Sequence, residues 1–382
     1  MLGRAVTRLD RLLTFRRACT YAALLIAIYA SAWLYVVVNG SPPLNSSGEP
    51  IGGDYIAFHA AGRLVLSGEG ARLYERAAVA AVQDNLLQGQ RPGFYDAFRN
   101  PPFFALLFAP LSALDLLSGY AVWTVLSVAA LGVAVALLVA GEPALRARWR
   151  GVAILVLGFA PVYFGLINGQ NATLSLLLYV LLYRALRQHQ PVRAGVWAAL
   201  GLFKPQLFVL FPLLFVVRRC WRAIAAYAVV AAVLALVCVG LVGIDGVDSW
   251  LRILATQEAT NAAANGWRMH SLKSFFDQLL PTHTAAALGL YAALSLALLA
   301  MLAHAWSRTE VVDPRLWIVT CLVAVLVDPH LLDYDLTVLV PAGALAAVHV
   351  PGLRWWMVLL YPLLIARAQL PVITGTVPLA TP

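Results

Sequence analysis

Residues 118–140 read SGYAVWTVLSVAALGVAVALLVA, an apolar run without a single charged residue. At about 1.5 Å per residue, a helix of this length crosses the roughly 30 Å of hydrocarbon in a bilayer. The run therefore predicts a transmembrane helix. Runs of comparable length occur at 19–39, 222–243, 284–306, 333–349 and 353–370. Shorter runs, which we interpret as thin, tilted or broken spans, occur at 152–167, 172–187, 194–203, 207–217 and 316–327.

The composition of the chain excludes an ordinary soluble domain. Of its 382 residues, 62% are hydrophobic and 12% are charged, whereas globular chains are about 45–50% apolar and about 25% charged. Lipid must therefore surround most of the chain. The net charge of +9 comes from Arg residues clustered between the apolar runs, a pattern of membrane topology signals and not of nucleic-acid binding. The four cysteines have neither metal-ligand nor disulfide spacing.

Basic residues indicate how the chain threads the membrane, because cytoplasmic loops carry an excess of Lys and Arg. We place the N-terminus inside, as a signal anchor that begins with Arg4, Arg8, Arg11, Arg16 and Arg17. Alternation then puts further clusters inside: Arg146, Arg148 and Arg150; Arg184, Arg187 and Arg193; Arg218, Arg219 and Arg222; Arg308 and Arg315; and Arg354. The apolar runs and these clusters together predict an all-α, multi-pass protein of the inner (plasma) membrane. We expect one transmembrane domain over residues 1–382, with about eleven crossings.

Two segments decide that count. Residues 103–117 are apolar, but a full crossing there would move every later Arg cluster outside, so we expect a re-entrant or interfacial helix. Residues 194–217 are interpreted as two short crossings that meet near Lys204. The alternative is one span kinked at Pro205, which would place two basic clusters on opposite faces.

The first outer loop, residues 40–117, is too long for a passive connection. Residues 54–66 and 73–88 show amphipathic spacing and predict helices that lie in the membrane interface. Asp54 follows two glycines and precedes the first of these helices. A carboxylate at this position is either an ordinary N-cap or a functional group.

The other unusual polar residues also fall on the outer side, and each has two interpretations. Lys204 interrupts an apolar run, where it either extends to the interface or binds a phosphate. The amides of Asn168, Gln170 and Asn171 form a turn or bind sugar hydroxyls. Gln206 follows Lys204 and Pro205 in the same break of the apolar run.

Two further outer clusters carry charge. Arg268, His270 and Lys273 either contact lipid headgroups or bind a lipid phosphate. His330, between Asp328 and Asp333, is a candidate general base or metal ligand, although the spacing is no zinc motif. The triplet 333–335 has the form of a metal-nucleotide DxD motif, to which we give little weight because a nucleotide-sugar donor is expected in the cytoplasm.

The order of these motifs resembles glycosyltransferase family 87, in the membrane-embedded C-type superfamily (GT-C), over about residues 50–345. The first motif is Gly53-Asp-Tyr-x-x-x-His-x-Ala-Gly, followed by Leu73-Tyr74. The later motifs are Asn100-Pro-Pro-Phe-x-Ala-Leu-Leu-Phe-Ala-Pro-Leu, Gly169-Gln-Asn, Gly201-x-x-Lys-Pro-Gln and Asp328-Pro-His-x-x-x-Tyr-Asp-Leu. Asp328 stands where the family more often has Ser, and His59 where it often has an aromatic residue.

The resemblance implies a GT-C-type bundle that takes a sugar, typically mannose, from a polyprenyl monophosphate. Such enzymes transfer the sugar to a lipid or glycan acceptor on the non-cytoplasmic face, usually with inversion, and without a metal or other cofactor in the scheme. Asp54 matches the family's catalytic carboxylate, and we add His330 as a second catalytic candidate. The substrate-binding candidates are His59, Asn100, Asn168, Gln170, Asn171, Lys204, Gln206, Arg268, His270 and Lys273.

Two other functions compete with this interpretation. A transporter or lipid flippase fits the span count and Lys204, but the sequence shows no internal repeat and few polar residues inside the membrane. A non-catalytic membrane scaffold would leave Asp54 and the break at Lys204 unexplained.

Overall fold

A computed structural model describes residues 14–265 and 268–350, and in these ranges the fold is built from helices. In the same ranges, β pairing is limited to isolated bridges such as the one between Met269 and Leu332. The prediction of an all-α protein is confirmed for this part of the chain. The predicted span 353–370 and the residues Arg4, Arg8, Arg11 and Arg354 lie outside it.

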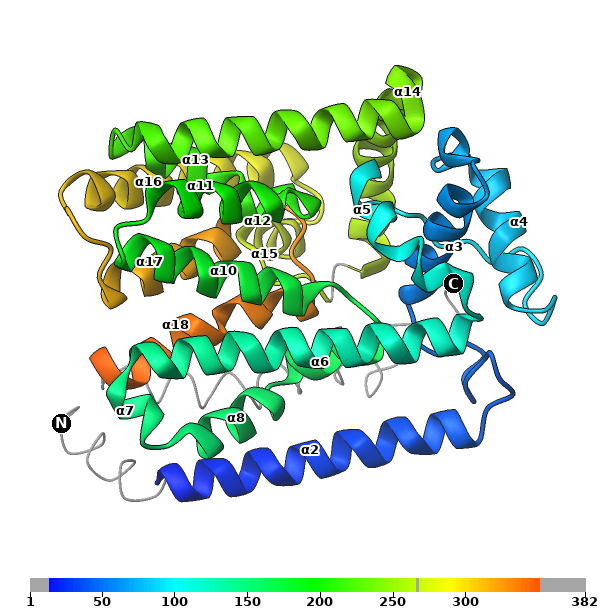
Figure 1. The fold of residues 1–382 in the computed structure, drawn as a ribbon, viewed down its shortest axis with the longest axis horizontal. Helices are drawn as coiled ribbons and strands as arrows, with labels where there is room; N and C mark the ends of the chain where they lie inside the picture. Colours follow the sequence, from blue (N-terminus) through cyan, green and yellow to red (C-terminus); the bar gives the residue numbers. More distant parts are fainter. Residues whose placement is uncertain (1–13, 266–267, 351–382) are drawn as a thin grey trace.

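Four helices of the described chain are long and apolar enough to cross a membrane (Figure 1). They are α2 (Phe15–Val38), α6 (Leu116–Gly141), the first part of α14 (Trp221–Asn265) and α16 (Thr284–Ser307). Large apolar side chains are exposed on all four, for example Leu24, Val125, Leu236 and Leu296. Continuous apolar surface of this extent is not found facing water. Lipid therefore covers these helices, and the chain is a helical membrane protein.

A bent pair of helices, α8 (Trp149–Leu157) and α9 (Ala160–Ile167), forms a fifth candidate span. The two helices meet at 61°, and Pro161 lies in the first turn of α9. At the bend, a Cβ on Gly158 would lie 2.8 Å from the Cβ of Ala22 on α2. The predicted run 152–167 therefore forms a sharply bent helix pair, which is either a broken span or a re-entrant loop and packs closely on α2.

The eleven predicted crossings are not confirmed, because the described residues contain four candidate spans, or five with the bent pair. The remaining runs form shorter helices: α10 (Ala172–Arg187), α11 (Pro191–Leu200), α13 (Leu210–Val217), α17 (Pro314–Val327) and α18 (Leu339–His349). The run predicted at 333–349 begins as the 3-10 helix η5 (Asp333–Val338), which shortens α18.

The run predicted at 222–243 matches the first part of α14, up to Gly243. Helix α14 turns at Gly243, where φ is 73°, and then continues to Asn265. Asp245, Asp248 and Arg252 interrupt the apolar pattern of this second part, so hydropathy alone did not predict it. Figure 1 shows α14 bending down beside α5 (Pro102–Phe108) after the turn.

Residues 191–217 form a helical hairpin, here called the Lys204 hairpin. Helix α11 continues into η3 (Gly201–Phe203), the chain leaves helical geometry at Lys204, and α12 (Pro205–Phe208) leads into α13. A Cβ on Gly201 would lie 2.1 Å from the Phe208 ring, so the turn is very tight. Two short helices meet near Lys204, as predicted, and not one kinked span; that each of them crosses the membrane stays a prediction, because neither is among the candidate spans.

The first outer loop folds as one unit of residues 39–115, the first-loop unit. It contains α3 (Tyr55–Leu66), η1 (Gly70–Arg72), α4 (Arg76–Leu86), α5 and η2 (Leu111–Ala113). The two helices predicted at 54–66 and 73–88 are confirmed as helices, but α3 is buried on most of its surface and is not a helix with one free polar face. The seven residues of α5 span only about 10 Å and cannot cross a membrane.

The first-loop helices and several Arg-bearing connections lie at opposite ends of the molecule. Figure 1 shows the first-loop helices α3, α4 and α5 at one end, whereas the connections that follow α10, α13 and α16 lie at the other. The second set carries Arg187, Arg218 and Arg308. Three of the Arg clusters that were predicted to lie inside are thus at the end opposite the first-loop unit, and that unit carries Arg63, Arg72, Arg76, Arg91 and Arg99. The predicted threading stays a prediction.

Two apolar cores stabilise the structure. The larger core fills the main bundle and contains Tyr179, Phe211 and Trp317. The smaller core fills the first-loop unit, and Phe203 of the Lys204 hairpin joins it by stacking on Phe104 with a centroid distance of 4.7 Å. A polar pocket lies where the two cores meet.

Close packing of α3 against α5 predicts a sharp difference between two helical glycines. A Cβ on Gly62 would lie 2.3 Å from Ser112 Oγ and 2.6 Å from the Phe108 backbone carbon, whereas a Cβ on Gly132 of α6 meets nothing within 4 Å. We expect Gly62→Ala to lower the unfolding temperature, with a loss of roughly 1–3 kcal/mol from overpacking. Gly132→Ala is the matched control and should be neutral or slightly stabilising. Thermal unfolding in detergent measures both, and equal midpoints would contradict the packing.

Candidate active site

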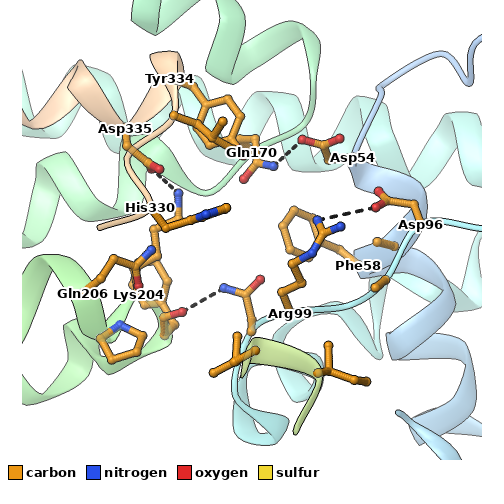
Figure 2. Close-up of a pocket in the computed structure, with 18 of the residues that line it drawn as sticks. Asp54, Phe58, Asp96, Arg99, Gln170, Lys204, Gln206, His330, Tyr334 and Asp335 are labelled. Atoms are coloured by element: carbon orange, nitrogen blue, oxygen red, sulfur yellow. Dashed lines mark hydrogen bonds and ion pairs between the residues drawn. The ribbon is translucent and has the colours of Figure 1, made fainter. Parts of the chain in front are cut away.

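The pocket is a cavity of about 250 Å³ with polar walls from four parts of the chain (Figure 2). The first-loop unit contributes Asp54, Asp96, Arg99 and Asn100. The opposite wall contains Lys204, Gln206, His330, Tyr334 and Asp335. Gln170 joins the two sides, and Trp250, Ile253 and Leu254 of α14 form an apolar side. Of the twelve predicted site residues, the structure thus brings six together around this cavity: Asp54, Asn100, Gln170, Lys204, Gln206 and His330.

Asp54 is held by the amide of Gln170, whose Nε2 donates to Asp54 Oδ2 at 2.5 Å. Glycines allow the two loops to approach this closely. Gly53 and Gly169 both have positive φ, and a Cβ on either would lie 2.5 Å from an atom of the other loop, Asn168 Oδ1 or Tyr55 Cβ. The contact leaves the second carboxylate oxygen of Asp54 for a ligand in the pocket.

The N-cap interpretation of Asp54 is wrong. The residue precedes α3, but its side chain makes no capping hydrogen bond and its backbone is already helical, at φ −64° and ψ −9°. An N-cap residue normally has extended geometry and accepts from the first turn. The carboxylate is therefore used in the pocket and not by the helix.

Lys204 is buried, with 6% of the residue exposed, so the interpretation that it extends to the interface is wrong. Its Nζ forms an ion pair with Asp335 Oδ1 and lies 5.0 Å from the centre of the Tyr334 ring. Pro205 starts α12 directly after it, which fixes Lys204 at the tip of the hairpin. The residue therefore places a compact positive charge on the wall opposite Asp54.

Asn100 ties the two walls together. Its Nδ2 donates to the carbonyl oxygen of Phe203 at 2.8 Å, and its own carbonyl accepts from the Tyr74 hydroxyl at 2.7 Å. The first bond links the first-loop unit to the Lys204 hairpin. Asn100 thus has a structural role in addition to its place on the pocket wall.

Asp96 and Arg99 line the pocket but were not among the predicted site residues. Their side chains lie 3.8 Å apart, between Arg99 Nη1 and Asp96 Oδ1. Burial, and then the negative charge of Asp54, raise the pKa of Asp96 to about 7. Two charged residues directly before the Asn100-Pro-Pro motif were the available signal. Nothing in the sequence pointed to the part of α14 that lines the pocket, because the helix was not predicted to continue beyond Gly243.

Three predicted binding residues lie behind the cavity wall. His59 is fully buried on α3, with Nδ1 3.5 Å from the Tyr55 hydroxyl, and burial lowers its pKa to about 4, helped by Arg63 and opposed by Asp115. Asn168 donates to the Phe164 carbonyl at 2.9 Å and packs on Gly53. Asn171 is fully buried at the start of α10.

Three more predicted residues lie in the segment that follows α14. Arg268 pairs with Asp333 through two contacts of 3.0 Å and lies 5.9 Å from the centre of the Tyr334 ring. His270 donates its backbone N–H to the Leu331 carbonyl at 3.0 Å. Lys273 pairs with Asp277 at 2.7 Å on α15 (Leu272–Leu279). Lys204 and Arg268 thus pair with both carboxylates of the 333–335 triplet, Asp335 and Asp333.

The buried pair of Lys204 and Asp335 predicts non-additive changes in stability. Lys204→Met should destabilise the fold by about 3–5 kcal/mol, because it leaves the Asp335 carboxylate buried without its cation. The double variant Lys204→Met/Asp335→Leu removes both charges and should recover most of the loss. Thermal unfolding of the purified variants measures this. A double variant as unstable as the single one would contradict the ion pair.

The raised pKa of Asp96 predicts a pH dependence of stability. The folded chain holds this proton more tightly than the unfolded chain, so stability falls as the pH rises from 3.8 to about 7. Asp96→Asn keeps the neutral form, so its unfolding temperature should fall less over this range and exceed that of the wild type at pH 8. The control Asp84→Asn on α4 lies outside the pocket and should keep the wild-type slope. If the unfolding temperatures of Asp96→Asn and the wild type change in parallel with pH, the raised pKa of Asp96 is contradicted.

Comparison with known proteins supports the resemblance from the motifs. The model of glycosyltransferase family 87 matches residues 98–329. The match includes Asn100, Gln170, Lys204 and Gln206 of the pocket, and His330 follows its last residue. Neither the curated proteins nor the solved structures include a match. Since the family match covers more than half of the 382 residues, the chain belongs to glycosyltransferase family 87.

Proposed function

We propose that this glycosyltransferase moves a sugar, mannose, from a polyprenyl phosphate to a hydroxyl of a lipid or glycan acceptor. The observation that supports this best is the polarity of the pocket. Asp54, oriented by Gln170, faces a cavity whose opposite wall carries Lys204 and His330 (Figure 2). A base on one side and positive charge on the other suit a substrate with an attacking hydroxyl and a departing phosphate.

The chemistry is a single displacement with inversion at the anomeric carbon. The acceptor oxygen forms the new bond to that carbon as the bond between the carbon and the phosphate oxygen breaks. Asp54 accepts the proton of the acceptor hydroxyl as a general base. The polyprenyl phosphate leaves with both electrons of the broken bond, so no oxidant, reductant or metal is needed to balance the step.

The opposite wall stabilises the leaving group. As the bond breaks, negative charge grows on the phosphate, and Lys204 supplies a preorganised positive charge. The phosphate then competes with Asp335 for Lys204, whose ion pair keeps it in place before the donor binds. His330 donates a hydrogen bond from the same wall, and Asn100 and Gln206 bind sugar hydroxyls. Arg268, His270 and Lys273 contact the lipid headgroup region near this wall.

The apolar helices place the reaction at a membrane. Trp250, Ile253 and Leu254 form an apolar side of the pocket, which suits the first isoprene units of the donor. The first-loop unit lies at the end of the molecule opposite the Arg-rich connections (Figure 1). By the positive-inside rule this arrangement supports a pocket on the non-cytoplasmic face of the inner (plasma) membrane, with the N-terminus in the cytoplasm.

The general-base role of Asp54 predicts a large loss of turnover. Asp54→Asn should lower kcat by about 10²–10⁴-fold, since an amide cannot accept the proton, with little change in donor binding. The measurement is transfer of labelled mannose from polyprenyl phosphate by the purified protein. Asp248→Asn is the control, because Asp248 is an exposed carboxylate on α14 that pairs with Arg252.

Two results would overturn the assignment at different levels. Equal turnover by Asp54→Asn and the wild type would exclude Asp54 as the base. No turnover by the wild type with any lipid-linked sugar would instead favour the competing function, a transporter or lipid flippase. Lipid movement in vesicles without sugar transfer would then support that alternative.

A further inference from the structure

Asp96 is held in the pocket wall by a buried amide. The Nε2 of Gln83 donates to the Asp96 carbonyl at 2.7 Å, and the Asp96 N–H donates back to Gln83 Oε1 at 2.9 Å. Gln83 lies on α4 and is fully buried. The two hydrogen bonds fix the Asp96 backbone from behind, without using its carboxylate. The side chain is thereby directed into the cavity, as Figure 2 shows.

The contact with Arg99 does not account for this carboxylate. The pair is 3.8 Å apart, longer than a hydrogen bond, and the side chains of Arg99 and Asp96 are 40% and 21% exposed. Arg99 is itself held in place, because its carbonyl accepts from Trp250 Nε1 at 2.9 Å. The side chains of Asp96 and Arg99 therefore face the same cavity from fixed backbones, and they can bind a ligand together.

The position of Asp96 near Asp54 is electrostatically unfavourable. Burial and the charge of Asp54 both oppose ionisation of Asp96. A fold selected only for stability would have a neutral side chain here. Chains depart from such local rules mainly at functional sites. Asp54 already has the orienting contact with Gln170 that suits a base, so a second role remains for Asp96.

We propose that Asp96 binds a hydroxyl group of a sugar in the pocket, next to the hydroxyl that Asp54 deprotonates, and thereby selects the substrate. This inference rests on the proposed function. A carboxyl group suits the role because it accepts from a hydroxyl when ionised and also donates when protonated. Arg99 offers donors to the oxygen of a neighbouring hydroxyl. The bound sugar belongs either to the acceptor or to the donor, and both have the same hydroxyl chemistry.

The test compares Asp96→Asn with substrates that lack single hydroxyl groups. Mannosyl polyprenyl phosphate is the donor and octyl α-mannoside the acceptor, and each is replaced in turn by its monodeoxy-mannose analogues. For the wild type, loss of the contacted hydroxyl should lower kcat/KM by about 10- to 100-fold. Asp96→Asn should show a similar loss with the complete substrates. With the analogue that lacks the contacted hydroxyl, it should lose little more, because the same contact is removed twice.

The controls separate a failed inference from a failed function. Asp96→Asn leaves the Gln83 hydrogen bonds to the backbone intact and should remain folded, which its unfolding temperature verifies. Asp84→Asn on α4 should keep wild-type kinetics with every substrate. The proposal is supported if the losses from Asp96→Asn and from one missing hydroxyl do not multiply. Whether that hydroxyl belongs to the acceptor or to the donor then identifies the bound sugar.

Two outcomes overturn the inference. If the wild type is active and the kcat/KM losses from Asp96→Asn and from the missing hydroxyl multiply for every analogue, Asp96 contacts no sugar hydroxyl. The proposed function would still stand. If Asp96→Asn loses turnover as completely as Asp54→Asn with all substrates, Asp96 takes part in the proton transfer and not in selection. A wild type that transfers mannose to no acceptor would contradict the proposed function, and the inference that rests on it would fall as well.

Discussion

The contact between two glycine-containing turns is the constraint on which the pocket depends. Gly53 and Gly169 lie where a side chain would collide with the opposing turn, so their absence of a Cβ sets the distance between the first-loop unit and the main bundle. That distance brings Gln170 onto Asp54. It also fixes the gap across which Asp54 faces Lys204. A shift of about 1 Å in this contact would weaken the hydrogen bond that orients Asp54 and change its distance from Lys204.

The pocket combines a fixed scaffold with charges that are costly to bury. Two apolar cores hold its walls, and Asn100 and the stack of Phe203 on Phe104 join them. Within this frame, Lys204 is balanced by Asp335, and Arg268 by Asp333. Asp54 and Asp96 have no comparable cation in contact among the residues that line the pocket, since Arg99 is 3.8 Å from Asp96. On one wall each of these cations is thus paired with a carboxylate, whereas Asp54 and Asp96 leave the other wall acidic.

Sequence reasoning was most accurate where a local pattern fixes the local structure. The long apolar runs predicted α2, α6 and α16, and Pro205 with Lys204 predicted the break in the hairpin. It failed where context overrides the pattern. Helix α14 passes Gly243 and continues into a polar stretch because that stretch packs beside α5. The count of eleven crossings is not confirmed, because several of the apolar runs it includes form helices shorter than a span in the described chain.

The sequence by itself determined that the chain is helical, lies in lipid and carries its unusual polar motifs in a fixed order, because hydropathy, charge and short motifs are local properties. It did not determine which of those motifs meet. Asp54 and Gln170 are 116 positions apart and Lys204 and Asp335 are 131 apart, and only packing brings such pairs into contact. The tertiary structure therefore decided that Asp54 faces the pocket and does not cap α3, that Lys204 is paired and buried, and that Asp96 belongs to the site. Each of these depends on how close two distant segments approach, which the glycine turns and the two cores set.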